Sequence, residues 1–485
     1  MALFLPLLLP LLGAAVVLFG KERKTATRVA LACGLLEVVA IGNLVRVIHS
    51  ASGGEIGGRY LRADGLTSFF LVNIAVVFGL VLIYSTGYLR HIPEGRFSSP
   101  RWFYSLLFLS LFTMIAVYLA GNLGLMWIFV EATTLASALL VGFYNTEGAV
   151  EAGWKYLIVC TVGIAFALLG TITLYLAAVR SGVSPESALD WTNLMSAAHR
   201  FGAASDLVKM AFVFVTIGYG TKIGFVPMHS WLPDAHAEAP SPISAMLSAV
   251  LLNCALYALL RFDAITSRAI GTGFPHTLLL VFGSLSVVVA AFLMVVQRDL
   301  KRLLAYSSIE HMGIIAIGVG LGGVFGLFGA LLHAFNHSIA KSLLFFTAGN
   351  VRENFSTLRM ERIRGMARSL PWTSGALVLG ALAIVGMPPF GLFVSEFFIL
   401  TAAFSAARYQ VAALVLISLS VVFGALVYHF QGMLSGDTGE EPAHPKWVRS
   451  EFAVMGICAG LLLALGIRVP VALTNLVHVA MGVLQ

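Results

Sequence analysis

Charged residues are scarce in this sequence. Asp, Glu, Lys and Arg make up 11% of its 485 residues, whereas hydrophobic residues make up 59%. Soluble domains average about 25% charged and 45–50% apolar residues. So little charge cannot keep that much apolar surface in water, which excludes a soluble DNA-binding protein despite the net charge of +7. The composition predicts an integral membrane protein.

Cysteine is also scarce, and redox motifs are missing. The four cysteines, Cys33, Cys160, Cys254 and Cys458, are far apart and lie in apolar runs. This spacing excludes a disulfide-stapled secreted scaffold, and no CxxC pair or Cys/His cluster suggests a metal. The sequence has no GxGxxG ahead of a helix and no CxxCH haem motif. We therefore expect no cofactor and no metal in this chain.

Long apolar runs dominate what is present. A helix needs about 20 mostly apolar residues to cross a bilayer. Fourteen segments meet this requirement, which predicts an all-α polytopic membrane protein. They are roughly 2–20, 27–48, 66–86, 102–120, 123–144, 153–179, 207–229, 241–262, 275–297, 302–322, 324–349, 370–403, 409–432 and 451–474.

The Lys and Arg residues predict the orientation of these helices. Eighteen of the thirty lie in loops that follow odd-numbered spans, and ten lie after even-numbered spans. Cytoplasmic loops of membrane proteins collect positive charge. The bias predicts that both termini lie outside a bacterial or archaeal cytoplasmic (inner) membrane. The first span, followed directly by KERK, is expected to be a retained helix and not a signal peptide.

Two spans contain helix breakers in related positions. The seventh reads IGYGTKIGFVPMHSWLP and the twelfth reads LAIVGMPPFGLFVSEFFIL. Proline removes a backbone donor and clashes with the preceding turn, and paired interrupted helices are typical of inverted-repeat transporters. We therefore predict two inverted five-helix repeats, spans 4–8 and 9–13, with helices 7 and 12 broken. The expected division is 1–101 for three N-terminal helices, 102–262 and 275–432 for the repeats, and 451–485 for a C-terminal helix.

Two charges inside the first predicted repeat need an explanation. Glu131 lies in span five and Lys222 beside the break in span seven. A Lys or Asp near the bilayer centre costs about 2.5–3.5 kcal/mol on insertion scales, so such residues are functional by default. We interpret them as a carboxylate and an amine that share or trade a proton as their pairing changes. The alternative is a static ion pair that holds two helices together.

The second predicted repeat carries a similar set. His333, His337 and Lys341 are spaced i, i+4, i+8, which places them on one helix face. Histidine titrates near neutral pH and passes a proton between its two nitrogens, so we interpret the set as a proton path centred on Lys341. Simple helix packing is the alternative. Two histidines at i, i+4 also suit zinc, but no Glu stands at the HExxH position and no third ligand is evident.

Glu396 follows the second break and is the expected terminal proton site, or else a static partner of Lys341. Further candidates lie nearer the membrane faces. These secondary candidates for the relay are Lys155, Glu151, His229, Asp234, His236, Glu238, Glu310 and His311. For these the sequence equally allows a purely structural role.

Three stretches around these residues resemble a known family. KIGFVPMHSWLPDAHAEAPSPISAMLS, RDLKRLLAYSSIEHMG and HAFNHSIAKSLLFFTAGNV are similar to antiporter-like subunits of respiratory complex I and of Mrp-type cation/proton antiporters. The resemblance covers roughly spans three to thirteen and is most specific in 221–248 and 298–350. It implies fourteen helices with two inverted five-helix repeats. It also implies transport roles for the glutamate Glu131, the lysines Lys222 and Lys341, and the terminal Glu396.

Two departures qualify the resemblance. Many relatives have a lysine or histidine in span eight, where this chain has Asn253, which bonds water but holds no proton at neutral pH. The link between Lys222 and Lys341 then needs water, His311 or His333. The EHMG form of residues 310–313 resembles the F-type membrane subunits of hydrogenase-4, among the group 4 NiFe hydrogenases, more than complex I proper.

The sequence therefore predicts a proton- or sodium-translocating membrane subunit of a redox-driven complex. Its partner subunits are expected to carry iron–sulfur clusters and a NiFe centre. The alternatives are a subunit of complex I proper, a stand-alone Mrp-like cation/proton antiporter, the membrane subunit of an inorganic-carbon uptake complex, and a purely structural anchor. A catalytic role for this chain itself is not expected.

Overall fold

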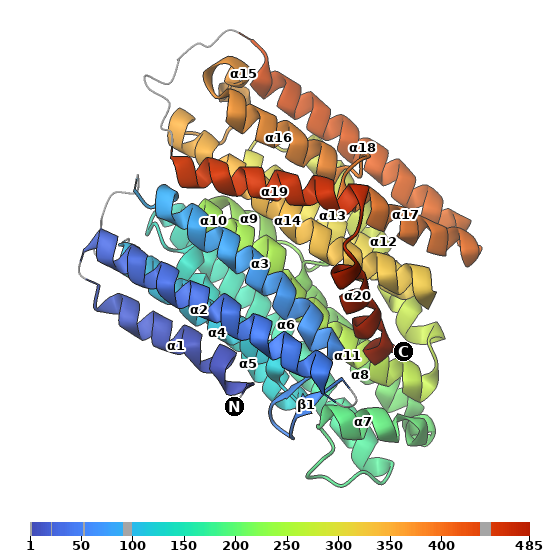
Figure 1. The fold of residues 1–485 in the computed structure, drawn as a ribbon. Coiled ribbons are helices and arrows are strands. Elements are labelled where there is room, and N and C mark those ends of the chain that lie inside the picture. Colours follow the sequence, from blue (N-terminus) through green and yellow to red (C-terminus); the bar gives the residue numbers. More distant parts are fainter. Residues whose placement is uncertain (1, 21, 52–53, 91–98, 437–447) are drawn as a thin grey trace.

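The computed structural model describes residues 2–20, 22–51, 54–90, 99–436 and 448–485. Three of the cations used to predict the orientation, Lys21, Arg96 and Lys446, lie outside these ranges. The described residues form a bundle of helices, many of them running side by side (Figure 1). A two-stranded antiparallel ribbon, β1 (Ile56–Gly57) and β2 (Arg62–Ala63), precedes the third helix, with Ile56 opposite Ala63.

The helices fall into two groups along the chain. The first group is α1 (Phe4–Leu18), α2 (Arg23–Ser50), α3 (Gly65–Tyr88), α4 (Pro100–Leu119), α5 (Leu123–Val141), α6 (Glu147–Arg180), α7 (Trp191–Ala197), the 3₁₀ helix η1 (Ala198–Ala204), α8 (Ser205–Ile223), α9 (Trp231–Glu238), α10 (Ser241–Met246), the π-helix η2 (Leu247–Leu251) and α11 (Leu252–Ile270). The second group is α12 (Gly273–Val295), α13 (Leu300–Leu321), α14 (Gly323–Phe355), the 3₁₀ helix η3 (Met360–Arg362), α15 (Met366–Ser369), α16 (Pro371–Ile384), α17 (Gly391–Ser405), α18 (Tyr409–Leu434), α19 (Arg449–Ile467) and α20 (Val471–Leu484).

Short polar residues begin several of these helices. Asp64 accepts a hydrogen bond from Thr67 N at 3.0 Å before α3, and Asn122 caps α5 in the same way. Thr146 and Asp299 cap α6 and α13. A side-chain oxygen at this position satisfies a backbone donor that the helix itself cannot use. These caps fix where the apolar segments begin.

The expected fold class is confirmed, because the described residues are almost entirely helical and apolar. Among them, twelve helical segments are long and apolar enough to cross a membrane. The first predicted span is a helix of 15 residues, and the twelfth is divided into α16 and α17, so neither reaches that length alone. The number fourteen therefore remains a prediction.

Both predicted helix breaks are present. Helix α8 ends at Ile223, where Gly224 has φ +91°, and the chain becomes helical again at Trp231. Helix α16 ends at Ile384, Gly386 has φ +64°, and α17 begins at Gly391. A positive φ suits glycine because it has no Cβ. Val226–Pro227 and Pro388–Pro389 within the two breaks are cis.

The last predicted span was wrong in its boundary. Residues 451–474 do not form one helix, because α19 ends at Ile467 and α20 begins at Val471. Pro470 lacks a backbone donor and disfavours a helical conformation at the residue before it. Helix α20 then packs against α3, and Val479 lies so close to Gly65 that a side chain at Gly65 would overlap it.

The two least apolar spanning helices, α13 and α14, lie in the interior. The most apolar stretches of the α10–α11 segment and of α13 are entirely buried, and α14 is the least apolar of the twelve spans and mostly buried. The neighbouring α12 and α18 are more apolar, and most of the residues in their apolar stretches are not buried. This arrangement encloses the polar side chains of α13 and α14 in protein. Polar groups at membrane depth are tolerated only where protein or water, and not lipid, surrounds them.

A buried ion pair ties α3 to α11. Arg261 donates two hydrogen bonds to Asp64, Nη1 to Oδ2 at 2.7 Å and Nη2 to Oδ1 at 2.8 Å. The guanidinium also lies 4.3 Å from the ring centroid of Trp191 and donates to Tyr257 OH at 2.8 Å. This cluster joins four segments: α3, α7, α11 and the end of α4, where Tyr118 O accepts a hydrogen bond from Tyr257 OH.

Candidate functional site

Lys222 lies fully buried in the last turn of α8, next to the break. Its Nζ donates to Thr134 Oγ1 of α5 and to Tyr156 OH of α6, the latter at 2.9 Å. Tyr156 OH is in turn hydrogen-bonded to Ser137 Oγ at 2.8 Å. The partial negative charge at a helix C-terminus favours a cation there. Both of the side chains that accept from this amine are neutral hydroxyls.

Glu131 is not in direct contact with Lys222. Its Oε1 accepts a hydrogen bond from Thr161 Oγ1 at 2.7 Å, and the side chain is partly exposed at the surface of α5. Within the described ranges, no carboxylate oxygen lies within 4.0 Å of Lys222 Nζ. The static ion pair considered from the sequence is therefore not what the structure contains. Thr134, which accepts a hydrogen bond from Lys222, lies one helical turn after Glu131 on α5.

The second set is organised around a pair of histidines from different helices. His311 Nδ1 of α13 and His333 Nε2 of α14 are 2.9 Å apart, so one donates and the other accepts. His333 Nδ1 lies 3.0 Å from Ser395 Oγ of α17. His311 Nε2 is 3.5 Å from Glu310 Oε2, and the ring of His337 is 5.3 Å from that of His311. All these side chains are fully buried.

Lys341 continues this set along the same face of α14. Its Nζ donates to Leu304 O at 2.8 Å and to Ser307 Oγ, both in α13. The i, i+4, i+8 spacing thus directs the side chains of α14 towards α13. In the part of the chain that the structure describes, Lys341 Nζ has no carboxylate within 4.0 Å, so it is not a direct partner of Glu396.

Glu396 lines a side pocket. This pocket has a volume of about 330 Å³ and lies between α17 and α18; Phe393, Phe397 and Phe423 are among its lining residues. The glutamate is 4% exposed, and its Oε1 has no hydrogen-bond partner among the described residues. Gly386 faces the carboxylate so closely that any side chain there would collide with it. The break between α16 and α17 therefore makes the space that this carboxylate occupies.

The region between the two sets contains amides and hydroxyls. Asn253 Nδ2 donates to Ala249 O at 2.8 Å and to Ser338 Oγ at 3.2 Å, and its Oδ1 has no partner in the described residues. Ser248 Oγ and Ser308 Oγ are 2.8 Å apart. Ser248 lies in the π-helix η2, a local irregularity that is frequent at functional sites.

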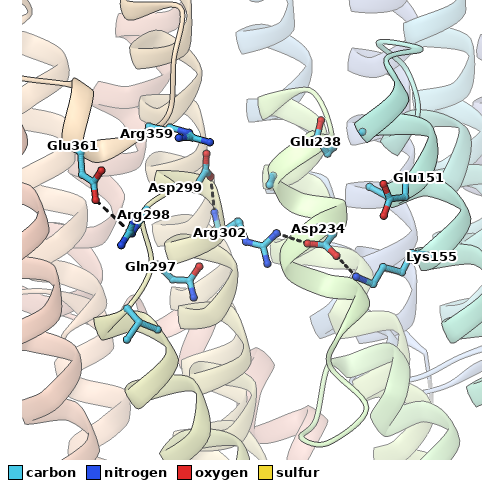
Figure 2. Close-up of a pocket in the computed structure, with 14 residues that line it drawn as sticks. Glu151, Lys155, Asp234, Glu238, Gln297, Arg298, Asp299, Arg302, Arg359 and Glu361 are labelled. Atoms are coloured by element: carbon cyan, nitrogen blue, oxygen red, sulfur yellow. Dashed lines mark hydrogen bonds and ion pairs between the residues drawn. The ribbon is translucent and has the colours of Figure 1, made fainter.

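A charged pocket opens at one end of the bundle (Figure 2). It has a volume of about 610 Å³ and contains Asp234 of α9, whose carboxylate pairs with Lys155 of α6 and Arg302 of α13. Figure 2 shows Asp234 between these two cations, with Glu151 and Glu238 on the α6 and α9 sides. Asp234 therefore joins the first group of helices to the second.

Replacing Asp234 with asparagine is expected to have a small effect on stability. The side chains of Lys155 and Arg302 are 43% and 40% exposed, so water screens both pairs. Exposed ion pairs contribute about 0–1 kcal/mol. Thermal unfolding of the purified variant in detergent should show an apparent Tm close to that of the wild type. A large fall in Tm would contradict this and would give the bridge a structural role.

The remaining candidates are separate from the two sets. His236 is buried with neither ring nitrogen bonded among the described residues, and its ring stands edge-on to Phe345. His229 is partly exposed, with its ring 6.2 Å from that of Tyr306. Lys301, counted as a loop charge from the sequence, is fully buried and donates to Ala237 O and Ala239 O. Its position within the charged 298–302 run gave no signal of burial.

Comparisons with known proteins give consistent matches. A family model described as "NADH:quinone oxidoreductase/Mrp antiporter, TM" matches residues 120–424. The "Hydrogenase-4 component F homolog" of Methylacidiphilum infernorum (isolate V4) is 40% identical over 434 residues, covering 86% of this chain and 89% of that protein. "Hydrogenase-4 component B" of Escherichia coli (strain K12) is 32% identical over 381 residues, 74% of this chain and 53% of that protein.

Solved structures share the fold over nearly the whole chain. A chain of the archaeal membrane-bound sulfane sulfur reductase has a TM-score of 0.87 and 25% identity, covering 99% of this chain and 97% of that one. A chain of the Mrp complex from Dietzia sp. DQ12-45-1b has a TM-score of 0.86 and 20% identity, covering 100% and 97%. A chain of respiratory complex I from Thermus thermophilus has a TM-score of 0.83 and 24% identity, covering all of both chains.

Proposed function

Because the chain belongs to the NADH:quinone oxidoreductase/Mrp antiporter family of transmembrane proteins, we propose that it moves protons across the membrane within a hydrogenase-4-type complex. It is an antiporter-like membrane subunit of the kind found in complex I and hydrogenase-4 assemblies. The observation that carries the proposal is the enclosed run of titratable side chains that joins α13, α14 and α17.

In the second half, buried titratable side chains outline the proposed path of a proton. Lys341 stands at one end, and His337 lies one turn before it on α14. The ring of His337 is 5.3 Å from that of His311, which is bonded to His333. An imidazole takes up a proton at one nitrogen and releases one from the other. His333 then reaches Ser395, the residue next to Glu396 at the side pocket. Imidazole nitrogens are poor ligands for an alkali cation, which favours H⁺ over Na⁺.

In the first half, the neutral hydrogen-bond partners of Lys222 suit an amine that gains and loses a proton. Lys222 is held by hydroxyls of Thr134 and Tyr156, so losing its proton leaves no unpaired carboxylate behind. Glu131 lies near enough to influence the amine through Thr134 and reaches the surface of α5. We propose that residues 102–262 and 275–432 act as two inverted half-channels, linked through Asn253, the serines beside it and bound water.

The proposed setting follows from the relatives and the charge bias. The chain is expected in a bacterial or archaeal cytoplasmic membrane with both termini outside, because basic loops favour the cytoplasmic side. Its relatives are named as hydrogenase-4 components, so we expect partner subunits with iron–sulfur clusters and a NiFe centre to supply the energy. This chain would contribute the ion path and no redox centre.

Lys222→Ala and Glu396→Gln test the proposal. Each removes one proton-carrying group, so we expect proton uptake by energised vesicles of the intact complex to fall at least tenfold, since positioned proton-transfer groups contribute about 10²–10⁴-fold. Lys209→Ala is the matched control, because Lys209 is an exposed lysine of the same helix α8 that pairs with Asp206. Normal uptake in both test variants would overturn the mechanism and favour a purely structural subunit.

A further inference from the structure

A three-residue cluster in the second half has the composition of a metal site. Nitrogens of His311 and His333 and a carboxylate oxygen of Glu396 all lie within 4.8 Å of one another, and all three side chains are buried. They come from three helices, α13, α14 and α17. We propose that this cluster binds one divalent transition metal ion, with zinc as the best match, and that the ion reaches it from the side pocket beside Glu396.

The donor set matches zinc chemistry. Two imidazoles and one carboxylate are a known zinc ligand set, with bonds of about 2.0–2.2 Å and a fourth position left open. Two ligand atoms bound to one tetrahedral ion at those distances stand about 3.4 Å apart. His311 Nδ1 and His333 Nε2 are 2.9 Å apart, and the three ligand atoms lie within 4.8 Å of one another. The two nitrogens would therefore separate slightly and the Glu396 carboxylate would move towards them to complete the set.

The second nitrogen of each histidine faces an oxygen atom, and among the described residues that of His333 is hydrogen-bonded whereas that of His311 is not. His333 Nδ1 faces Ser395 Oγ at 3.0 Å, and His311 Nε2 faces Glu310 Oε2 at 3.5 Å. Metal-binding histidines characteristically donate their other N–H to a carboxylate, a backbone carbonyl or water, which fixes the ring and the tautomer. With those protons on the outer nitrogens, His311 Nδ1 and His333 Nε2 both become free to bind an ion between them.

Glu396 supplies an independent observation. Its Oε1 is buried without any hydrogen-bond partner among the described residues. An unsatisfied buried acceptor of this kind costs about 1–3 kcal/mol and calls for an explanation such as an ion. The carboxylate borders the pocket of about 330 Å³, which gives an ion access to the otherwise enclosed histidines. The same pocket leaves room for a water molecule as the fourth ligand of the ion.

This site differs from the one that the sequence suggested. His333 and His337 have the i, i+4 spacing, but both nitrogens of His337 lack a partner among the described residues and it is not a member of the close set. The second and third ligands come instead from α13 and α17. Their sequence distances from His333 follow no helical period, so spacing could not have found them.

Occupation of the site would block ion transport, and this consequence rests on the proposed function. An ion between His311 and His333 replaces the proton that they share, and it also joins α17 to α13 and α14. Zinc therefore acts as an inhibitor of the path and not as a catalytic ion. The binding itself is independent of whether the chain moves protons.

The test measures binding on the purified full-length chain in detergent. Titration with Co²⁺ should give one tetrahedral-type visible absorption band per chain, which Zn²⁺ displaces. His333→Gln and Glu396→Gln are each expected to weaken Co²⁺ binding at least tenfold. Ser395→Ala, which removes an outer partner, should weaken it by about 10–100-fold. His337→Gln is the matched control with unchanged binding, because it is a neighbouring buried histidine outside the set.

Two outcomes overturn the proposal: wild-type protein that binds no Co²⁺, or binding that survives His333→Gln. Where a variant elutes as an aggregate, X-ray absorption of the zinc-loaded wild type reports the ligand set, and a first shell without two imidazole nitrogens and at least one oxygen contradicts the site. Proton uptake by vesicles is measured separately. Uptake without metal binding disproves only the zinc site, whereas metal binding without uptake disproves only the proposed function.

Discussion

Replacement of Lys341 by methionine is expected to lower proton uptake about a hundredfold or more. Lys341 begins the proposed path of the second half, and its Nζ is bonded to Leu304 O and Ser307 Oγ of α13. Methionine fills a similar volume and adapts to irregular spaces, but it carries no proton. A missing proton-transfer group typically costs about 10²–10⁴-fold in rate. The measurement is acidification of vesicles that contain the intact complex, energised by its own electron donor.

Ser307→Ala serves as the comparison for this result. It removes one hydrogen bond to Lys341 and leaves the amine in place. We expect a much smaller decline, because Leu304 O still accepts from the amine. Equal uptake by Lys341→Met and wild-type vesicles, with the complex assembled, would exclude the path through α13 and α14.

Asp64→Asn is expected to destabilise the protein by about 3–5 kcal/mol. Arg261 and Asp64 form a two-bond ion pair whose side chains are each 6% exposed. Removing one partner of such a pair leaves an uncompensated buried charge, and this accounts for the expected loss. Asparagine is as good a helix cap as aspartate, so the start of α3 is preserved and the charge alone is tested. Equilibrium unfolding in a denaturing detergent measures the difference.

Two further measurements separate this effect from others. Glu361→Gln removes an ion pair with Arg298 in which the Glu361 side chain is 64% exposed and the Arg298 side chain 79%. This variant should leave stability unchanged. The double variant Asp64→Asn/Arg261→Gln should recover part of the loss, because no charge is then left unpaired. A double variant less stable than Asp64→Asn would contradict the assignment of the loss to the stranded guanidinium.

The same pair gives the wild type an acid-sensitive contribution. Burial tends to raise the pKa of Asp64, but the adjacent Arg261 and the hydrogen bonds from Thr67 outweigh it and hold the pKa below its usual value. A carboxyl with a lowered folded-state pKa stabilises the fold above its unfolded pKa of about 3.9. That stability is lost as the pH falls through the lower folded-state value, and Asp64→Asn removes this dependence.

The features predicted correctly from sequence are those with a local cause. Proline and glycine determine backbone geometry where they stand, so the breaks after Ile223 and Ile384 could be located. Charges inside apolar runs are rare and costly, so Lys222 and Lys341 stood out in the sequence. The family resemblance was likewise carried by contiguous motifs, and the family model confirms it.

The partners of these residues could not be predicted in the same way. Helical spacing relates residues of one helix, and it therefore suggested His333 with His337 in place of His333 with His311. The hydroxyls of Thr134 and Tyr156 that hold Lys222 come from two other helices, and hydroxyls are common in any apolar helix. Lys301 was misjudged because its burial depends on the distant segment 237–239 that covers it.

The enclosure of α14 has a consequence for how the protein is made. This helix is the least apolar of the spanning segments, and it contains Lys341 together with His333 and His337. A single lysine at the helix centre already opposes entry into lipid by about 2.5–3.5 kcal/mol on insertion scales. Helix α14 is therefore expected to leave the translocon only in company with α13, which receives its polar face. The residues that would conduct protons in the mature subunit are the ones that delay its assembly in the membrane.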